Sequence, residues 1–129
     1  MLGDTLTFTL GGSGGTAKTL SKINQDKYSS EYLLRSSTDE IRARVRHSKE
    51  TVKRDSPEME RHNVELTQTV FASGDTPAKI RQCYIVVRTQ VGDDLGLNVD
   101  VAQAVTYFLT EANLLKVVGW NRSPLGHSL

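Results

Sequence analysis

The sequence predicts an α+β domain in which an antiparallel sheet of about six strands precedes one or two helices. From Thr5 to Val91, apolar and polar residues alternate in short segments separated by turn residues, which is the period of β-strands. After Gly92 the apolar residues recur at helical spacing instead. The length of 129 residues is typical of one domain, so we expect a single domain over 1–129.

Residues 1–23 are predicted to form an amino-terminal hairpin. Threonine alternates with apolar residues over 5–10, and a second strand pattern leads to Ile23. Between them lies the run Gly11-Gly12-Ser13-Gly14-Gly15. Lys18 does not directly follow the last glycine and no helical pattern follows, so this run indicates a hairpin turn rather than a phosphate-binding loop.

The main sheet is predicted over 31–91. Four alternating segments, 32–35, 41–47, 60–71 and 80–91, have the composition of strands. A charged loop over 49–57 and a turn over 73–78 with Gly and Pro separate the later ones.

Helices are predicted over 97–119. Asn98 is the expected amino-terminal cap, and Val101, Val105, Phe108 and Ala112 share one helical face. A second short helical segment begins at Leu114 and is expected to end at Gly119.

The strand over 41–47 carries the clearest functional signal. Arg42, Arg44 and Arg46 alternate with small apolar residues, so their side chains stand on one face of the sheet. Three guanidiniums in a row repel one another, and an extended anion such as nucleic acid phosphate would relieve the repulsion. The alternative is a solvated strand face that is balanced by cross-strand carboxylates.

The composition restricts the classes of function that the protein can have. Because 16 Lys and Arg nearly cancel 15 Asp and Glu, the net charge is +1, and nucleic-acid binding would depend on local placement. The single cysteine, Cys83, cannot form an internal disulfide and is expected to be buried. We expect neither a signal peptide nor a membrane span, and hence a soluble protein made in the cytosol.

One chain has too little helix to cover an apolar sheet face. About one and a half helices would cover the apolar side of six strands only in part, and the sheet edges would remain unpaired. We therefore expect a dimer formed through sheet edges, helices or both.

The order of amino-terminal hairpin, strands, strand-loop-strand and carboxy-terminal helices resembles that of the coat proteins of single-stranded RNA bacteriophages (leviviruses). Three segments are similar to the Caulobacter-infecting branch in particular. They are Leu10-Gly11-Gly12-Ser13-Gly14-Gly15-Thr16, Lys22-Ile23-Asn24-Gln25-Asp26 and Glu60-Arg61-His62-Asn63-Val64-Glu65. The resemblance implies an interlocked dimer with helices crossing over the partner. It also implies an icosahedral shell that packages genomic RNA on its interior sheet face, a virion assembled in the bacterial cytoplasm, and repression of replicase translation through an RNA hairpin.

The resemblance further implies an RNA-binding face. Tyr84 matches an aromatic residue on which a base stacks, and alternation independently assigns Tyr84 and the arginines to one kind of face. Val86 departs from the family, because better-known members have a polar base-reading residue there. The implied RNA-binding residues are Arg42, Arg44, Arg46, Arg61, Asn63, Glu65, Tyr84, Val86 and Arg88.

A metal site is the remaining expectation from the resemblance. The turn over 73–78 corresponds to a loop that gathers around the symmetry axes of the shell. Several copies of Asp75 would repel one another there unless Lys79 neutralises them or a divalent cation such as calcium binds. No cofactor is required for this function.

Two other functions remain open at this point. A dimeric cellular RNA-binding regulator that does not assemble further has the same features. A ribonuclease could use His47 and His62 as acid and base. Alternation places both histidines opposite the arginines, which disfavours the ribonuclease, and no Cys and His spacing predicts a zinc site.

Overall fold

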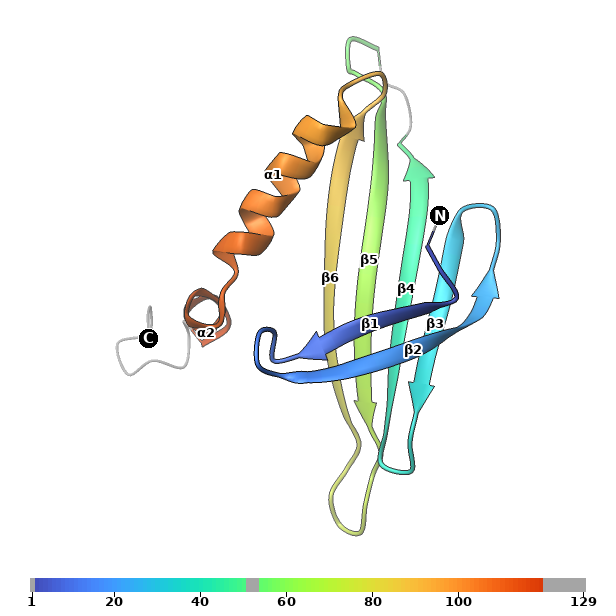
Figure 1. Ribbon diagram of the computed structural model, residues 1–129, viewed down its shortest axis with the longest axis vertical. Coiled ribbons are helices and arrows are strands. Elements are labelled where there is room, and N and C mark those ends of the chain that lie inside the picture. Colours follow the sequence, from blue (N-terminus) through green and yellow to red (C-terminus); the bar gives the residue numbers. More distant parts are fainter. Residues whose placement is uncertain (1, 51–53, 120–129) are drawn as a thin grey trace. The chain divides into compact units, whose positions relative to one another are not determined.

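The computed structural model describes residues 2–50 and 54–119. The chain divides into two compact units, Met1–Val91 with the strands and Gly92–Leu129 with the helices. The six strands form one antiparallel sheet in chain order (Figure 1). They are β1 (Thr5–Leu10), β2 (Thr16–Gln25), β3 (Ser29–Arg35), β4 (Asp39–Lys49), β5 (Met59–Val70) and β6 (Lys79–Gln90). The helices are α1 (Leu95–Phe108) and α2 (Glu111–Gly119), so the predicted fold class is confirmed.

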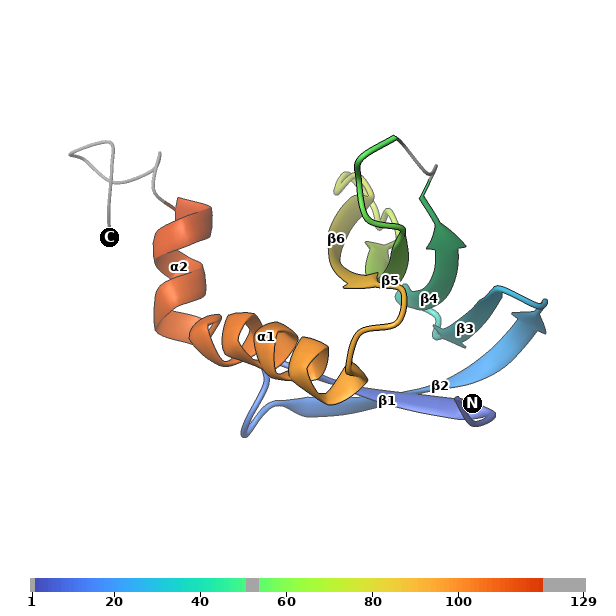
Figure 2. The same cartoon turned by 90° about the horizontal axis from the view of Figure 1, so that it is seen from above.

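The amino-terminal hairpin extends beyond the predicted 1–23. Gly11, Gly12 and Gly14 have φ values of 88°, 70° and 81°, a region that favours glycine, and this explains the glycine run at the turn. The register of β2 against β3 shifts between Lys22 and Asn24, and β2 continues to Gln25. The hairpin crosses one face of the following strands, as two views of the sheet show (Figures 1 and 2).

The core of the sheet unit lies beneath this hairpin. Leu20, Tyr32, Ile41 and Ala43 are fully or almost fully buried. The Tyr32 hydroxyl donates to the carbonyl oxygen of Gly3 at 2.8 Å, which satisfies the polar group of a buried ring. The partly buried residues packed against this core are Leu6, Phe8, Leu10, Leu34 and Leu66.

The apolar face of β5 and β6 is less well covered. Val64 is 40% exposed and Ile85 is 37% exposed. Cys83 is exposed as well, so the prediction of a buried cysteine is wrong, because β6 is the edge strand of the sheet. The single chain thus leaves apolar sheet surface in contact with water.

Two of the four main strands are longer than predicted, while β5 and β6 keep the predicted length of twelve residues and begin one residue earlier. β3 begins at Ser29 and β4 runs from Asp39 to Lys49, because polar residues at their ends continue the ladder. Part of the predicted loop over 49–57, residues 51–53, lies outside the described residues.

In the helical unit, the start of α1 and the boundary between α1 and α2 differ from their predictions. Asp94, not Asn98, caps α1, since its carboxylate accepts from the Gly96 amide at 2.8 Å. α1 ends at Phe108, whose carbonyl accepts from the Asn113 side chain, and Ala112 therefore belongs to α2. α2 ends at Gly119 as predicted.

The described residues of α1 and α2 include no buried side chain, although the apolar Val101, Val105 and Phe108 lie on α1. Within the described part of the chain, neither helix is long and apolar enough to cross a membrane.

Candidate nucleic-acid interface

The sheet register places all nine predicted site residues on one face. Arg44 on β4 stands opposite Glu65 on β5, which stands opposite Tyr84 on β6. The next row along the strands is Arg46, Asn63 and Val86. Arg42 shares this face by alternation along β4, and Arg61 pairs with Arg88 at the other end. We call this surface the arginine face.

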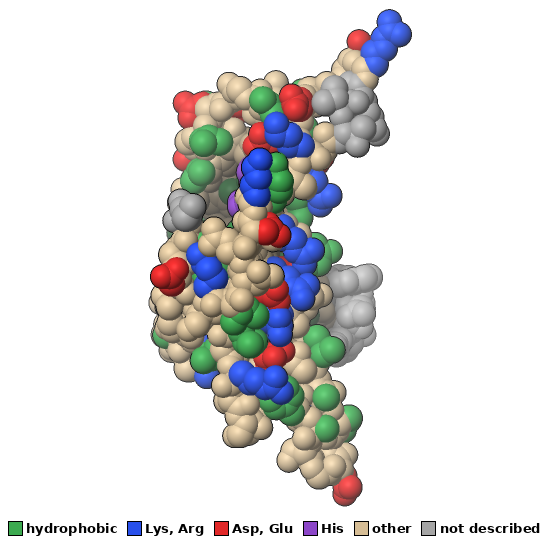
Figure 3. Space-filling view, turned by 90° about the vertical axis from the view of Figure 1, so that its right-hand side faces the viewer, with side chains coloured by type: hydrophobic (Ala, Val, Ile, Leu, Met, Phe, Trp, Pro, Cys, Tyr) green, Lys and Arg blue, Asp and Glu red, His purple; other side chains and the backbone are tan. Residues whose placement is uncertain are grey.

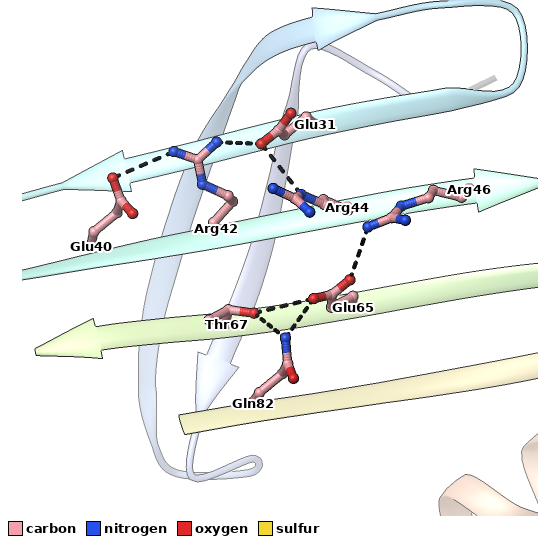
Figure 4. A network of polar contacts seen from close by, with 8 residues as sticks. All are labelled: Glu31, Glu40, Arg42, Arg44, Arg46, Glu65, Thr67 and Gln82. Carbon is pink, nitrogen blue, oxygen red and sulfur yellow. Dashed lines mark hydrogen bonds and ion pairs between the residues drawn. The ribbon is translucent and has the colours of Figure 1, made fainter. Parts of the chain in front are cut away.

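The arginines on β4 are held by carboxylates. Arg42 donates to Glu31 on β3, and its other terminal amino group lies 3.6 Å from Glu40. The Arg44 Nε lies 3.4 Å from the same Glu31 oxygen, and Arg46 lies 3.3 Å from Glu65 (Figure 4). The hydrogen bond from Arg42 lowers the pKa of Glu31, and Glu31 in turn raises the pKa of Arg42.

A second group of ion pairs lies where β6 ends. Both carboxylate oxygens of Glu50 accept from Arg88, at 2.7 and 2.6 Å, in a bidentate pair. This contact raises the pKa of Arg88. The Nε of Arg61 lies 3.9 Å from Glu50.

Neighbouring carboxylates therefore balance much of the positive charge. Those of Glu31 and Glu65 do so across strands, as the alternative interpretation of the arginine strand expected. The five arginines contact four glutamates, Glu31, Glu40, Glu50 and Glu65, so this set retains one net positive charge. The space-filling view shows basic and acidic side chains interleaved rather than one continuous basic patch (Figure 3). Long-range attraction of RNA by this set is thus weaker than five free arginines would produce.

Tyr84 offers a different kind of contact. It is 62% exposed on the arginine face, beside Glu65. Glu65 is itself held by Gln82, whose amide nitrogen donates to it at 2.6 Å (Figure 4). An exposed ring on a flat sheet can stack with an unpaired base.

Comparison with known proteins assigns the family. The model of the coat protein of phage phiCb5 matches residues 3–90, which is more than half of the chain. This chain belongs to the phage phiCb5 coat protein family. The resemblance to RNA-phage coat proteins is therefore confirmed. No curated protein has a significantly matching sequence.

Solved structures support the fold of this coat protein. The coat protein of bacteriophage EMS014 aligns with a TM-score of 0.65 at 12% identity, covering 84% of this chain and 74% of that chain. The chain of a virus-like particle of bacteriophage ESE058 aligns with a TM-score of 0.62 at 9% identity, covering 91% and 95%. At these identities, the similarity establishes the coat-protein fold alone.

His47 and His62 of the coat protein lie on the face opposite the arginines. His47 and His62 are register partners whose Nδ1 atoms are 2.8 Å apart, and His62 Nε2 lies 3.2 Å from the Thr89 hydroxyl. They line a hollow of about 500 Å³ together with Tyr28 and other residues. The structure does not bring these histidines and the arginine stripe together on one face, as ribonuclease chemistry on a bound phosphodiester would require.

Asp75 lies in an exposed turn. Ser73 and Thr76 close this turn through two backbone hydrogen bonds of 3.0 and 2.9 Å. In the described ranges, no three His, Cys, Asp or Glu residues are grouped as metal ligands. A cation at Asp75 would therefore need ligands from other copies of the coat protein, and this site stays a prediction.

Sequence reasoning missed the partners of the arginines. Glu31 and Glu40 were not predicted as members of the face, although alternation places Glu40 with Arg42. The pairing of Glu31 depends on the register of β3 against β4, which no local pattern shows.

Proposed function

We propose that this coat protein binds single-stranded RNA on the arginine face. The observation that carries the proposal is the collection, from three strands, of five guanidiniums around an exposed tyrosine. Each guanidinium has five N–H donors, and an ion pair with one carboxylate uses only one or two of them. The remaining donors are available to phosphate oxygens, while Tyr84 offers a surface to a base.

We also propose that two chains form a dimer. β6 is twelve residues long and has β5 as its sheet neighbour, so its outer edge can pair with another strand. Two β6 strands related by a two-fold axis would join two sheets into one. The exposed apolar residues of β5, β6 and α1 supply the surface that a second chain would bury.

Dimers of this kind are the proposed unit of an icosahedral shell. Membership in a coat protein family supports a structural role in the virion, and one structural neighbour forms a virus-like particle. In this proposal the arginine face lines the interior and packages the genome, and assembly takes place in the host cytoplasm. Binding of an RNA hairpin that represses replicase translation would use the same face.

The decisive experiment combines electron microscopy with measurement of nuclease-protected RNA. Wild-type protein should form closed shells of uniform size that contain RNA. Dimers alone at every concentration, with RNA present, would instead indicate a regulator that does not assemble.

A charge reversal tests the face itself. Arg44→Glu should reduce RNA content and RNA affinity while leaving the dimer intact, because it places a third carboxylate between Glu31 and Glu65. Lys49→Glu is the matched control, since Lys49 lies on the same strand but alternates to the opposite face. Equal RNA binding by Arg44→Glu and the control would show that RNA does not bind this face.

A further inference from the structure

A small polar hollow lies on the arginine face beside Tyr84. It has a volume of about 200 Å³ and is formed by β4, β5 and β6. Its charged members are Glu40, Arg42, Arg44 and Glu65, and the Gln82 amide and threonine hydroxyls complete it (Figure 4). Gln82 is two residues before Tyr84 on β6, so the hollow and the exposed ring adjoin each other.

The mixed charges of this hollow disfavour binding of either an anion or a cation. A phosphate in this space would face two carboxylates, and a cation would face two guanidiniums. A neutral planar group with both hydrogen-bond donors and acceptors could satisfy both kinds of side chain. The volume is below that of pockets for drug-sized ligands, and it suits one small heterocycle.

Polar groups remain available to such a ligand. Arg44 contacts Glu31 through Nε, and its two terminal amino groups have no hydrogen-bond partner among the described residues. Gln82 donates through Nε2 to Glu65 and Thr67, which leaves its carbonyl oxygen as an acceptor. Glu40 contacts Arg42 and Arg35 through one oxygen, so its second oxygen can accept as well.

We propose that this hollow binds one unpaired guanine base of RNA, an inference that rests on the proposed RNA-binding function. Guanine carries two adjacent acceptors, O6 and N7, which match the forked donors of Arg44. Its neighbouring N1–H and N2 amino groups are two adjacent donors that suit a carboxylate such as that of Glu40. Adenine and cytosine mix donors and acceptors along these edges, and uracil has a single donor.

The arrangement also assigns a role to Tyr84. A base adjacent to the bound guanine along the strand can stack on its exposed ring. The strand would then cross β6 with one base in the hollow and its neighbour on the ring, and arginine donors outside the hollow would contact the backbone.

The test measures binding of short fluorescent oligouridines to the purified full chain, kept unassembled at low concentration. Each oligonucleotide carries one central guanosine, adenosine, cytidine, uridine or inosine. The guanosine version should bind at least about tenfold more tightly than the adenosine, cytidine and uridine versions. Inosine lacks the N2 amino group, so the affinity of the inosine version should lie between that of the guanosine version and those of the other three.

Two variants and one control test whether the preference for guanosine depends on the side chains of the hollow. Arg44→Lys keeps the positive charge but removes the paired donors of the guanidinium, and Glu40→Gln removes the carboxylate. Each variant should lose the preference for guanosine while it still binds oligouridine. Glu50→Gln makes the same change of charge as Glu40→Gln, on the arginine face but outside the hollow. It should strengthen binding of every oligonucleotide equally and keep the preference.

Failures of the two proposals can be distinguished. Equal binding of all five oligonucleotides by the wild-type chain would overturn the guanine site and leave RNA binding by charge intact. A guanosine preference that persists in both Arg44→Lys and Glu40→Gln would also overturn the guanine site. Absence of binding at low salt would overturn the proposed RNA-binding function itself.

Discussion

Glu31 on β3 stands directly opposite Arg44 on β4, yet its closest ion pair is with the diagonal neighbour Arg42. One carboxylate thus holds two guanidiniums of the arginine stripe (Figure 4). This arrangement lowers the mutual repulsion of the arginines and orients them, and it also competes with phosphate for their donors.

Removing this carboxylate should strengthen RNA binding. In Glu31→Gln, Arg42 and Arg44 gain freedom to contact phosphates, so affinity at low salt should rise. The slope of log affinity against log salt should steepen by about 0.7 for each added phosphate contact. Fluorescence anisotropy over a salt series measures both effects.

Glu60→Gln is the control for this change, because Glu60 lies on the opposite face with His62. An unchanged slope in Glu31→Gln, or an equal change in Glu60→Gln, would show that Glu31 does not compete with RNA.

The same carboxylate should make stability depend on pH. The pKa of Glu31 is lowered below its ordinary value of 4.5 by the hydrogen bond from Arg42. The ion pair therefore stabilises the folded state fully above pH 4.5, and this contribution is lost as the pH falls through the lower folded-state pKa. Urea midpoints recorded from neutral to acidic pH should show this loss.

Two other carboxyl groups contribute in the same direction. Hydrogen bonds from the Tyr28 amide and then from Ser29 lower the pKa of Asp26, and the Gln68 side chain lowers that of Asp39. Since both remain in Glu31→Gln, the difference between its pH profile and that of the wild type isolates Glu31. Parallel profiles would contradict the assigned role of this ion pair.

Tyr84 should contribute through its ring rather than its hydroxyl. Tyr84→Ala should weaken RNA binding by about 1–3 kcal/mol, because it removes the stacking surface for one base. Tyr84→Phe should retain most of the affinity, since the ring remains. A loss in Tyr84→Phe as large as in Tyr84→Ala would point to a hydrogen bond of the hydroxyl instead.

The membership of the arginine face could largely be predicted from the sequence. Strand alternation is strictly local, so Arg42, Arg44 and Arg46 could be assigned to one face without knowledge of the fold. Because the strands pair in chain order, the predicted residues of β5 and β6 lie on the same side of the sheet as these arginines, as the pairing of Glu65 with Tyr84 shows.

The charge balance of the face could not be predicted in the same way. It depends on side chains that meet across strands, such as Glu50 with Arg88, which are 38 residues apart in the sequence. The prediction that Asn98 caps the first helix was wrong for a related reason. Asp94 and Asn98 are both good capping residues, and only the backbone conformation decides between them.

The turn with Asp75 leads to a prediction about assembled particles. We propose that copies of this turn meet in the shell, where their carboxylates would repel one another unless a hard cation binds between them. A chelator should then lower the melting temperature of wild-type particles and leave that of Asp75→Asn particles unchanged. Sensitivity in both would place the cation elsewhere, and insensitivity in both would refute a structural metal.

Phe108 should matter to the dimer more than to the single chain. The side chain is 57% exposed in the chain described, although it shares an apolar helical face with Val101 and Val105. If the partner buries it fully, Phe108→Ala should cost about 3 to 5 kcal/mol of dimer stability. The unfolding midpoint should also depend on protein concentration, because dissociation and unfolding are linked.

The matched control for Phe108→Ala is Gln103→Ala, which alters an exposed polar position of the same helix. It should leave both the midpoint and the sedimentation of the dimer unchanged. A wild-type monomer that stays folded at high dilution would show that the exposed apolar surfaces of β5, β6 and α1 do not need a second chain. The obligate dimer would then have to be abandoned, while the fold and the arginine face would stand.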